Sequence, residues 1–268
     1  MTARAESADQ GSAAMQGALW SRRAADWAEQ EELQVPIYDA VLDALAMAAG
    51  ARLLDVGCGS GVALREAALR GARVTGLDAA AGLVSIAARR VPEADVRVGD
   101  LLRLPFGDHE FDVVTGFNSF QFADDVVFAL AEARRVVRPG GAVAIQVWGR
   151  PERTQLGALI GAIAPHLPFP LPSGPGGRSY CDAGVLEELA TSAGLAPSFA
   201  RDIECPFDYP DDETLLRCSL GAGLVGLAAQ AVGEQAIRDA ILGAMAPFRT
   251  PDGGYHTENE WHYLIARA

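Results

Sequence analysis

The sequence predicts an α/β fold of the doubly wound type, in which an open, mainly parallel sheet carries helices on both faces and is extended by a helical cap. Between residues 50 and 149, short apolar runs alternate with helical segments, and this alternation is typical of βαβ units. A glycine-rich loop follows the first apolar run. In such folds, ligands bind beyond the carboxyl ends of the strands.

The chain before the sheet divides into two predicted parts. Residues 1–16 are rich in Ala, Ser and Gln and lack periodicity, which predicts a disordered N-terminus. Residues 17–49 contain two predicted helices that form an N-terminal lid region. Trp20, Ala24 and Trp27 share one face of the first helix, and Pro36 lies near the start of the second, a position that proline favours.

The core region, residues 50–149, is predicted to hold five strands and three helices in alternation. Short apolar runs indicate the strands, and longer stretches with helical periodicity indicate the helices. The predicted strands span residues 52–56, 73–77, 95–98, 111–115 and 142–147, and the predicted helices span residues 62–70, 81–91 and 125–137.

The remaining residues, 150–268, form the predicted substrate-side half, where the regular alternation ends. Asp182 is placed to cap a helix, because an aspartate side chain can accept a hydrogen bond from the first turn. In chain order we predict a Pro- and Gly-rich stretch (150–180), a helix from Asp182 to residue 192, a strand (197–204), a helical cap (211–248) and a final strand (261–266).

The charge and the apolar pattern exclude several classes of partner. The chain has 22 Arg or Lys against 35 Asp or Glu, a net charge of −13, with no cluster of cations to neutralise nucleic-acid phosphates. The longest uncharged run, residues 157–177, is interrupted by prolines and predicts no membrane span. The polar N-terminus has no signal-peptide core. We therefore expect a cytoplasmic protein.

Every basic residue of the chain is arginine, and the sequence contains no lysine. This excludes P-loop nucleotide hydrolases, which use a lysine on the phosphates, and Schiff-base enzymes, which need an amine nucleophile. Short-chain dehydrogenases, which pair a tyrosine with a lysine, are excluded too. The four cysteines match neither a zinc site nor a redox pair, so we expect reduced, packed thiols.

The glycine loop Gly57-Cys58-Gly59-Ser60-Gly61 follows the first predicted strand, and acidic residues follow the next two. Val62 stands where a dinucleotide-binding loop has its third glycine. Asp78, after the second strand, can accept both hydroxyls of a ribose, and Asp100, after the third, can accept a donor such as an adenine amino group. Each carboxylate alone is more typical of a loop cap, but together they predict one binding site.

These segments resemble the ordered motifs of class I S-adenosylmethionine-dependent methyltransferases, especially the branch typified by ubiquinone and menaquinone biosynthesis enzymes. The resemblance covers residues 50–148. The motifs that carry it are Asp55-Val56-Gly57-Cys58-Gly59-Ser60-Gly61, Asp78, Gly99-Asp100-Leu101, Phe111-Asp112-Val113-Val114 and Arg135-Val136-Val137-Arg138-Pro139-Gly140-Gly141. Residues 150–260 contain no motif of that family.

The resemblance implies a Rossmann-like, mainly parallel sheet of seven strands with an antiparallel last strand, and S-adenosylmethionine as cofactor. A carboxylate-lined site without lysine suits a cofactor that carries a sulfonium and no phosphate. The implied contacts are Gly57, Cys58, Gly59 and Gly61 under the methionine and ribose portions, Asp78 and Ala79 at the ribose, Asp100 and Leu101 at the adenine, and Asn118 beside the methyl group.

Methyl transfer depends on holding a nucleophile in line with an already activated methyl group, so the sequence predicts no specific catalytic residue. His166, Tyr180 and Asp182 are alternatives for a general base, although capping is the simpler role for Asp182. No set of metal ligands is recognisable, and no metal is predicted. The run Asn118-Ser119-Phe120-Gln121 lacks the prolines typical of enzymes that methylate base amino groups.

The predicted function is methyl transfer to oxygen, nitrogen or carbon of a small, apolar acceptor. The apolar segment 211–248 would cover the acceptor, and Trp20, Trp27 and Tyr38 would close over the cofactor. One alternative is a relative that binds S-adenosylmethionine without transferring methyl, as a cyclase-like or regulatory protein. Another is a nicotinamide-dependent oxidoreductase, which Val62 and the absence of lysine disfavour. The sequence predicts no oligomeric state.

Overall fold

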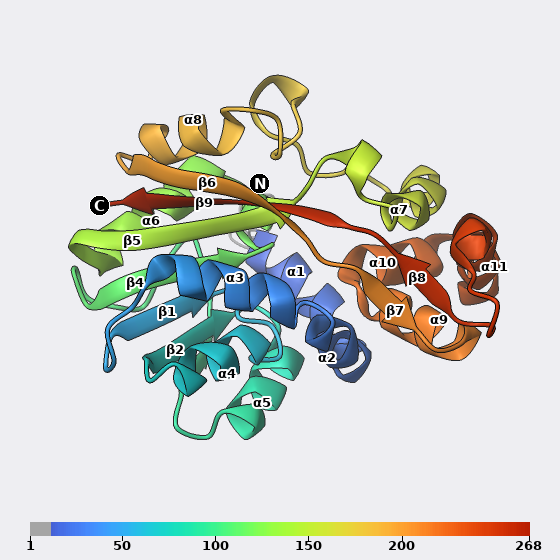
Figure 1. Ribbon diagram of the computed structural model, residues 1–268, viewed down its shortest axis with the longest axis horizontal. Helices are drawn as coiled ribbons and strands as arrows, with labels where there is room; N and C mark the ends of the chain where they lie inside the picture. Colours follow the sequence, from blue (N-terminus) through green and yellow to red (C-terminus); the bar gives the residue numbers. More distant parts are fainter. Residues whose placement is uncertain (1–11) are drawn as a thin grey trace, which may run out of the picture.

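The computed structural model describes residues 12–268, and its centre is a seven-stranded sheet (Figure 1). The strands lie in the order β3-β2-β1-β4-β5-β9-β6. All seven predicted strands are confirmed; six have bounds at or close to the predicted ones, and β5 begins five residues earlier than predicted, at Val137 instead of Ala142. Their bounds are β1 Arg52–Val56, β2 Arg73–Asp78, β3 Asp95–Val98, β4 Phe111–Phe117, β5 Val137–Trp148, β6 Ala196–Glu204 and β9 Glu260–Arg267.

The strand directions match the predicted class. Strands β1 to β5 pair in parallel, whereas β9 pairs antiparallel with both β5 and β6. The chain order reverses at β1, because β2 lies on one side of it and β4 on the other. Loops diverge at such a switch point and leave a crevice beyond the strand ends.

Helices cover both faces of the sheet (Figure 1), so the doubly wound arrangement is confirmed. Helices α6 (Val126–Val136) and α8 (Val185–Ser192) pack on one face; α3 (Val35–Leu45) and α4 (Val62–Leu69) pack on the other, and α5 (Ala81–Arg90) flanks β2 and β3. Successive side chains of a strand point to opposite faces. Thus Leu54 joins the α6–α8 core, while Leu53 joins the α3–α4 core.

The N-terminal lid consists of α1 (Ser12–Ser21), α2 (Ala24–Glu32) and α3. The predicted first helix is broken between α1 and α2, and Arg23 has a non-helical backbone there. Trp20 and Trp27 nevertheless meet edge to face, with 4.6 Å between ring centroids. Helices α1 and α2 contact α5 on one side and the cap helices on the other.

The prediction of disorder over residues 1–16 is wrong for its last part. Residues 12–16 lie in α1, whereas residues 1–11 are outside the described part of the chain. Tertiary contacts stabilise this turn of helix. The Ser12 amide donates to Asp124 Oδ2 over 2.7 Å, and Gly17 lies directly on the backbone of Ala79. Composition alone does not contain these long-range contacts.

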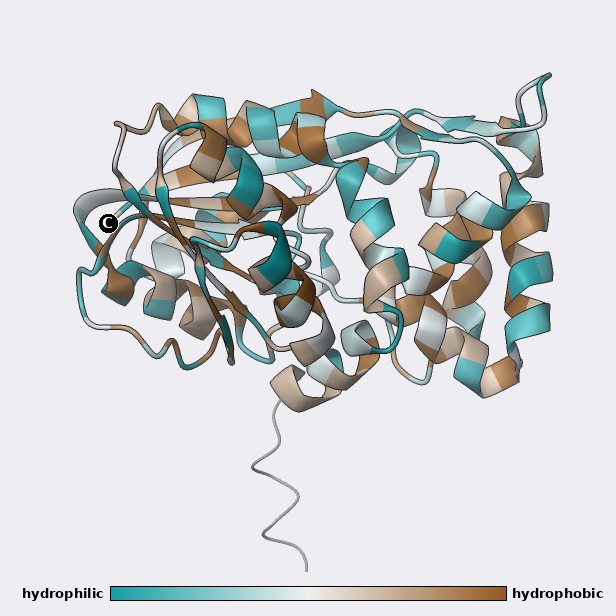
Figure 2. Ribbon diagram, turned by 90° about the horizontal axis from the view of Figure 1, so that it is seen from below, coloured by the Kyte–Doolittle hydropathy of each residue, from teal (hydrophilic) through white to brown (hydrophobic). Residues whose placement is uncertain are grey.

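The second half of the chain adds a cap beside the sheet (Figures 1 and 2). Helices α9 (Asp212–Gly221), α10 (Gly223–Val232) and α11 (Glu234–Met245) occupy the predicted cap region. The sequence did not predict α7 (Gly157–Ile163) or the two-stranded sheet of β7 (Phe207–Tyr209) and β8 (Tyr255–Thr257). These elements are too short for a periodic pattern to appear.

The cap has an apolar core of its own, which includes Trp261 from β9 and Ile37 from the lid. The sheet, the lid and the cap are therefore packed together through continuous side-chain contacts. Within residues 12–268, no single helix has the length and apolar character of a membrane span. Helices α9 and α10 meet that test only as a pair, and they are bent by 97°.

Two smaller predictions have different outcomes. Asp182 does not cap the following helix: α8 begins at Val185 after a left-handed Gly184, and the Asp182 carboxylate accepts the Ser179 amide over 2.9 Å. A glycine with positive φ stops the chain from entering the helix at Asp182. All four cysteines are free and buried, which confirms the prediction of packed thiols.

Candidate cofactor-binding site

A cavity lies beneath the lid at the carboxyl ends of β1 to β4, with helices α1–α3 forming its outer wall. The glycine loop after β1 lines it, together with Asp78 and Ala79 after β2 and Asp100 and Leu101 after β3. Asn118, directly after β4, completes the inner wall. The sheet thus brings residues from four separate loops to one crevice.

The glycine loop is pressed tightly into the protein. Its backbone is anchored by the amides of Gly57 and Cys58, which donate to the Leu77 carbonyl over 2.7 and 3.1 Å. Gly57 has φ +74°, and a Cβ there would collide with the side chain of Ser119. Ser119 Oγ in turn donates to the Val56 carbonyl over 2.6 Å. Glycine is needed at this position because the loop and the end of β4 touch.

The other two glycines of the loop also make room for protein neighbours. A Cβ on Gly59 would lie 2.8 Å from a carboxylate oxygen of Glu31, and one on Gly61 would lie 2.9 Å from Cβ of Ala87 in α5. Gly61 does not line the cavity; it allows α4 and α5 to pack closely. It is the single predicted cofactor-binding residue that lies away from the crevice.

Asp78 is half-buried between two loops at the floor of the cavity. Its Oδ2 accepts the Gly59 amide over 2.9 Å, and its Oδ1 accepts the Ala80 amide over 2.8 Å. Burial raises the pKa of Asp78, and these two amides oppose the rise. Each oxygen can accept a second hydrogen bond, so the carboxylate can still receive two hydroxyl donors.

Two further carboxylates of the cavity are almost completely buried. Glu31 of α2 is 3% exposed and Asp55 of β1 is 1% exposed. Desolvation raises the pKa of Glu31 to about 7 and that of Asp55 to about 8. Thr115 donates to Asp55 over 2.7 Å and the Ser60 amide donates to Glu31 over 2.8 Å; these bonds oppose the rise.

Aromatic side chains form the apolar part of the wall. Trp20, Trp27 and Tyr38 of the lid all line the cavity, as predicted for residues that close over the site. Tyr38 packs edge to face on Phe117 at the end of β4, with 4.7 Å between ring centroids. These rings make the wall of the cavity apolar, and electrostatic interactions are stronger in apolar surroundings.

Some residues of the cavity were not predicted from the sequence, and two of the predicted candidates for a general base lie outside the cavity. Glu31 and Gln34 of the lid line the cavity. The signal for Glu31 was its spacing, four residues after Trp27 on the same helical face. Neither His166, in a short turn of helix after α7, nor Tyr180 lines it.

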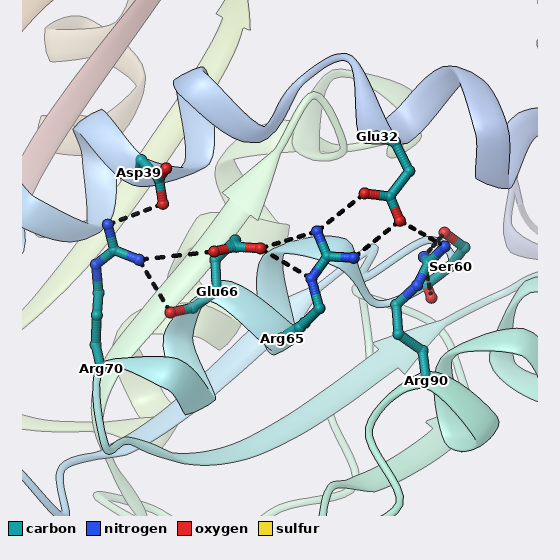
Figure 3. Close-up of polar contacts among 7 residues, drawn as sticks. All are labelled: Glu32, Asp39, Ser60, Arg65, Glu66, Arg70 and Arg90. Carbon is teal, nitrogen blue, oxygen red and sulfur yellow. Dashed lines mark hydrogen bonds and ion pairs between the residues drawn. The ribbon is translucent and has the colours of Figure 1, made fainter.

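Ion pairs attach the outside of the lid to the body (Figure 3). Arg65 of α4 donates to both carboxylate oxygens of Glu32, over 2.9 Å each, and Arg90 of α5 lies 3.0 Å from the same group. Arg70 pairs with Asp39 of α3 at 2.8 Å. Arg90 also donates to the Ser60 carbonyl over 2.7 Å, so it joins the lid to the glycine loop.

The comparisons with known proteins agree with this geometry. A family model described as "Methyltransferase domain" matches residues 54–145. A malonyl-[acyl-carrier protein] O-methyltransferase of Serratia marcescens is 31% identical, over 78% of this chain and 77% of that protein. The chain belongs to the class I S-adenosylmethionine-dependent methyltransferases. S-adenosylmethionine is the cofactor of this family.

Other relatives of this methyltransferase family match less of their length. A demethylmenaquinone methyltransferase of Renibacterium salmoninarum is 36% identical over 41% of this chain, and the match spans about half of that relative, 47%. Among solved structures, the YcgJ protein of Bacillus subtilis has a TM-score of 0.60 at 19% identity, covering 86% of this chain and 97% of that one. That likeness concerns the fold.

The residues present fit the family's cofactor. Four carboxylates line the cavity (Glu31, Asp55, Asp78 and Asp100), and the part of the chain that the structure describes contributes no arginine or histidine to it. A ligand with cationic groups and hydroxyl donors satisfies such a set, whereas a phosphate would be repelled. The glycine loop and Asp78 form the polar floor, and the lid supplies an aromatic cover.

Proposed function

We propose that the protein transfers the methyl group of S-adenosylmethionine to an oxygen, nitrogen or carbon atom of a small, apolar acceptor. One observation carries the proposal: carboxylates from successive strand ends meet in one crevice, under an aromatic lid, without a basic residue among the described residues of its wall. Family membership supports the choice of cofactor.

We assign the cofactor contacts as follows. Asp78 receives the ribose hydroxyls through the free acceptor positions of its carboxylate. Asp100, whose Oδ1 accepts the Leu102 amide over 2.8 Å, and Leu101 lie at the adenine edge. Gly57, Cys58 and Gly59 run beneath the methionine and ribose portions, and Gly61 acts only through packing.

Asn118 marks the transfer end of the site in this proposal. It follows β4 with a left-handed backbone, φ +51°, a conformation that costs free energy outside glycine and is often found at functional sites. Its amide donates to the Gln146 carbonyl over 2.9 Å, and its side chain accepts a hydrogen bond from Gln121. These contacts fix the position of Asn118, which lines the cavity together with Phe117 and Tyr38.

The mechanism that follows is positioning with exclusion of water. Bound S-adenosylmethionine supplies a methyl group on a sulfonium, activated for displacement. The chain holds the acceptor atom in line with that methyl group, at about 3 Å, and Tyr38 and Phe117 keep water from competing. No general base is assigned, since His166 and Tyr180 lie outside the cavity.

We propose that the three regions of the chain have the roles that the sequence predicts for them. Residues 50–149 bind the cofactor, residues 17–49 cover it, and residues 150–268 build the acceptor side with the apolar cap. An apolar cap beside the lid favours a hydrophobic acceptor. A cytoplasmic location and the absence of a nucleic-acid partner stay predictions from the charge and the apolar pattern.

The test is incubation with S-adenosylmethionine labelled in the methyl group and a panel of acceptors. The panel includes a demethylated quinone and a malonyl thioester, the acceptor types named for the two relatives, with phenols and amino sugars. Labelled product supports the proposal. Tight cofactor binding without transfer across the panel favours the relative that binds without methylating, and tight binding of a nicotinamide cofactor instead would reject the assignment.

A further inference from the structure

Glu31 is the carboxylate that the lid contributes to the cavity. It lies near the end of α2, and its Oε2 accepts the Ser60 amide of the glycine loop over 2.8 Å. Both of its oxygens would be within 2.9 Å of a Cβ on Gly59. The absence of that Cβ therefore lets a carboxylate from the lid lie directly on the loop that forms the cavity floor.

The groups around Glu31 are mainly acidic. Asp78 from β2 and Asp55 from β1 face it from the sheet, and Tyr38 faces it from α3. Arg90 from α5 lies near enough to favour its charged form, but Arg90 is already paired with Glu32 and the Ser60 backbone. Several buried carboxylates without a cation of their own among them are unfavourable when charged.

We propose that Glu31 binds the positively charged methionine end of the cofactor, so that closure of the lid and binding of the cofactor are coupled. This inference rests on the proposed function. A cation between Glu31, Asp55 and Asp78 relieves their mutual repulsion, and the lid must be closed for Glu31 to take part. The lid thus recognises the charge of the cofactor as well as covering it.

Glu32 provides a matched control on a different face of the same helix. Adjacent residues of a helix point about 100° apart. Accordingly, Glu31 lines the cavity. Glu32 faces Arg65 and Arg90 on the outside (Figure 3). Removing the Glu32 charge is expected to loosen the lid for every ligand, whereas only Glu31 is placed to distinguish a charged ligand from a neutral one.

The experiment compares wild type, Glu31→Gln and Glu32→Gln by calorimetric titration with three ligands. S-adenosylmethionine carries a sulfonium beside the ammonium and carboxylate of its amino-acid end, S-adenosylhomocysteine keeps the ammonium and carboxylate without the sulfonium, and 5′-methylthioadenosine has none of these charges. Glutamine keeps the oxygen that accepts the Ser60 amide. We expect Glu31→Gln to bind S-adenosylmethionine about 10- to 100-fold more weakly, as for loss of a charged hydrogen bond, and to bind methylthioadenosine within about twofold of wild type.

S-adenosylhomocysteine then separates the two cations. A similar loss for this ligand places Glu31 at the ammonium, and a loss for S-adenosylmethionine alone places it at the sulfonium. Glu32→Gln is expected to affect all three ligands equally. Circular dichroism and thermal melting check that the variants are folded.

A second measurement needs no variant. Burial raises the pKa of Glu31 to about 7 and that of Asp55 to about 8, and a bound cation lowers both. Binding of S-adenosylmethionine to wild type therefore releases protons near pH 7, and its affinity rises with pH across this range, whereas methylthioadenosine shows neither effect. Titrations in buffers of different ionisation enthalpy measure the protons released.

Three results would overturn the inference. In the first, Glu31→Gln binds S-adenosylmethionine as tightly as wild type. In the second, Glu31→Gln weakens the binding of methylthioadenosine by the same factor as that of S-adenosylmethionine. Glu31 would then only stabilise the glycine loop and would not recognise charge. In the third, Glu32→Gln shows the same ligand-selective loss. If the wild type binds neither S-adenosylmethionine nor methylthioadenosine, the proposed function fails together with the inference. This outcome differs from the three above, in which the wild type still binds the cofactor.

Discussion

The contact between the lid and the cap can be tested by a substitution that adds a single methyl group, Gly221→Ala. Gly221, the last residue of α9, lies against the backbone of α2. A Cβ there would be 2.5 Å from the Trp27 amide nitrogen and 2.8 Å from the Asp26 carbonyl carbon. These are backbone atoms, so no side chain can rotate away. In Gly221→Ala the two helices must separate by about 1 Å to restore van der Waals distance.

The expected cost follows from two opposing effects. Overpacking of a close contact costs about 1–3 kcal/mol, whereas replacing glycine by alanine in a helix contributes up to about 1 kcal/mol of stability. We therefore expect Gly221→Ala to be destabilised by about 1–2 kcal/mol. For a protein of this size, that lowers Tm by roughly 2–8 °C. Cofactor binding should weaken too, because α2 carries Glu31.

Gly226→Ala is the matched control. Gly226 lies in the adjacent helix α10. The atom nearest to a Cβ added there would be the Leu220 carbonyl oxygen at 3.8 Å, an ordinary van der Waals contact. This variant should be as stable as wild type or more stable by up to about 1 kcal/mol. Urea denaturation and thermal melting measure both variants. A Gly221→Ala protein at least as stable as Gly226→Ala would refute the reasoning.

Three other predictions concern the site, the start of β9 and the core that the lid shares with the cap. Asp78→Ala should weaken S-adenosylmethionine binding by about 1–3 kcal/mol, as expected for loss of a charged acceptor; unchanged calorimetric affinity in a folded variant contradicts the ribose role. Glu260 is 2% exposed, and the hydrogen bonds from Arg150 lower its pKa from 4.5. Its charged form therefore stabilises the fold above the unfolded-state pKa, and this stabilisation is lost as pH falls through the folded-state value. Urea melts should show Glu260→Gln less stable than wild type at pH 7, with the difference shrinking below about pH 4; a constant difference argues against the ion pair. Ile37→Ala removes a fully buried side chain shared by the lid and the cap and should cost about 2–5 kcal/mol; a loss below about 1 kcal/mol by urea denaturation would mean that the two do not share a core.

Much of the core was predictable because its signals are local. The strand before Gly57 is apolar on both sides, as in a buried parallel strand, and the loop that follows contains three glycines at alternate positions. Asp78 and Asp100 each follow the next strand along the chain. Parallel strands end at one edge of the sheet, so sequence order alone brought these residues together in the prediction. The structure places Asp78, Asp100 and the first two glycines on the cavity, and Gly61 away from it.

The errors arose where distant contacts outweigh local preference. Composition predicted disorder up to residue 16, yet Ser12 and Gly17 are held by Asp124 and Ala79. Asp182 has the residue type of a helix cap, but Gly184 redirects the backbone before the helix begins. The cofactor role of the loop glycines stays a prediction, and the structure adds a packing reason for them: Ser119, Glu31 and Ala87 fill the positions that their side chains would take.

The sequence by itself therefore determined the sheet, its glycine loop and the acidic strand ends, since periodicity and spacing are properties of neighbouring residues. Only the tertiary structure decided that Glu31 joins Asp55 and Asp78, that Gly61 serves packing, and that the lid lies between the cofactor crevice and the cap. These relations connect residues far apart in the chain. They depend on how helices of fixed shape pack around one sheet, which no local pattern specifies.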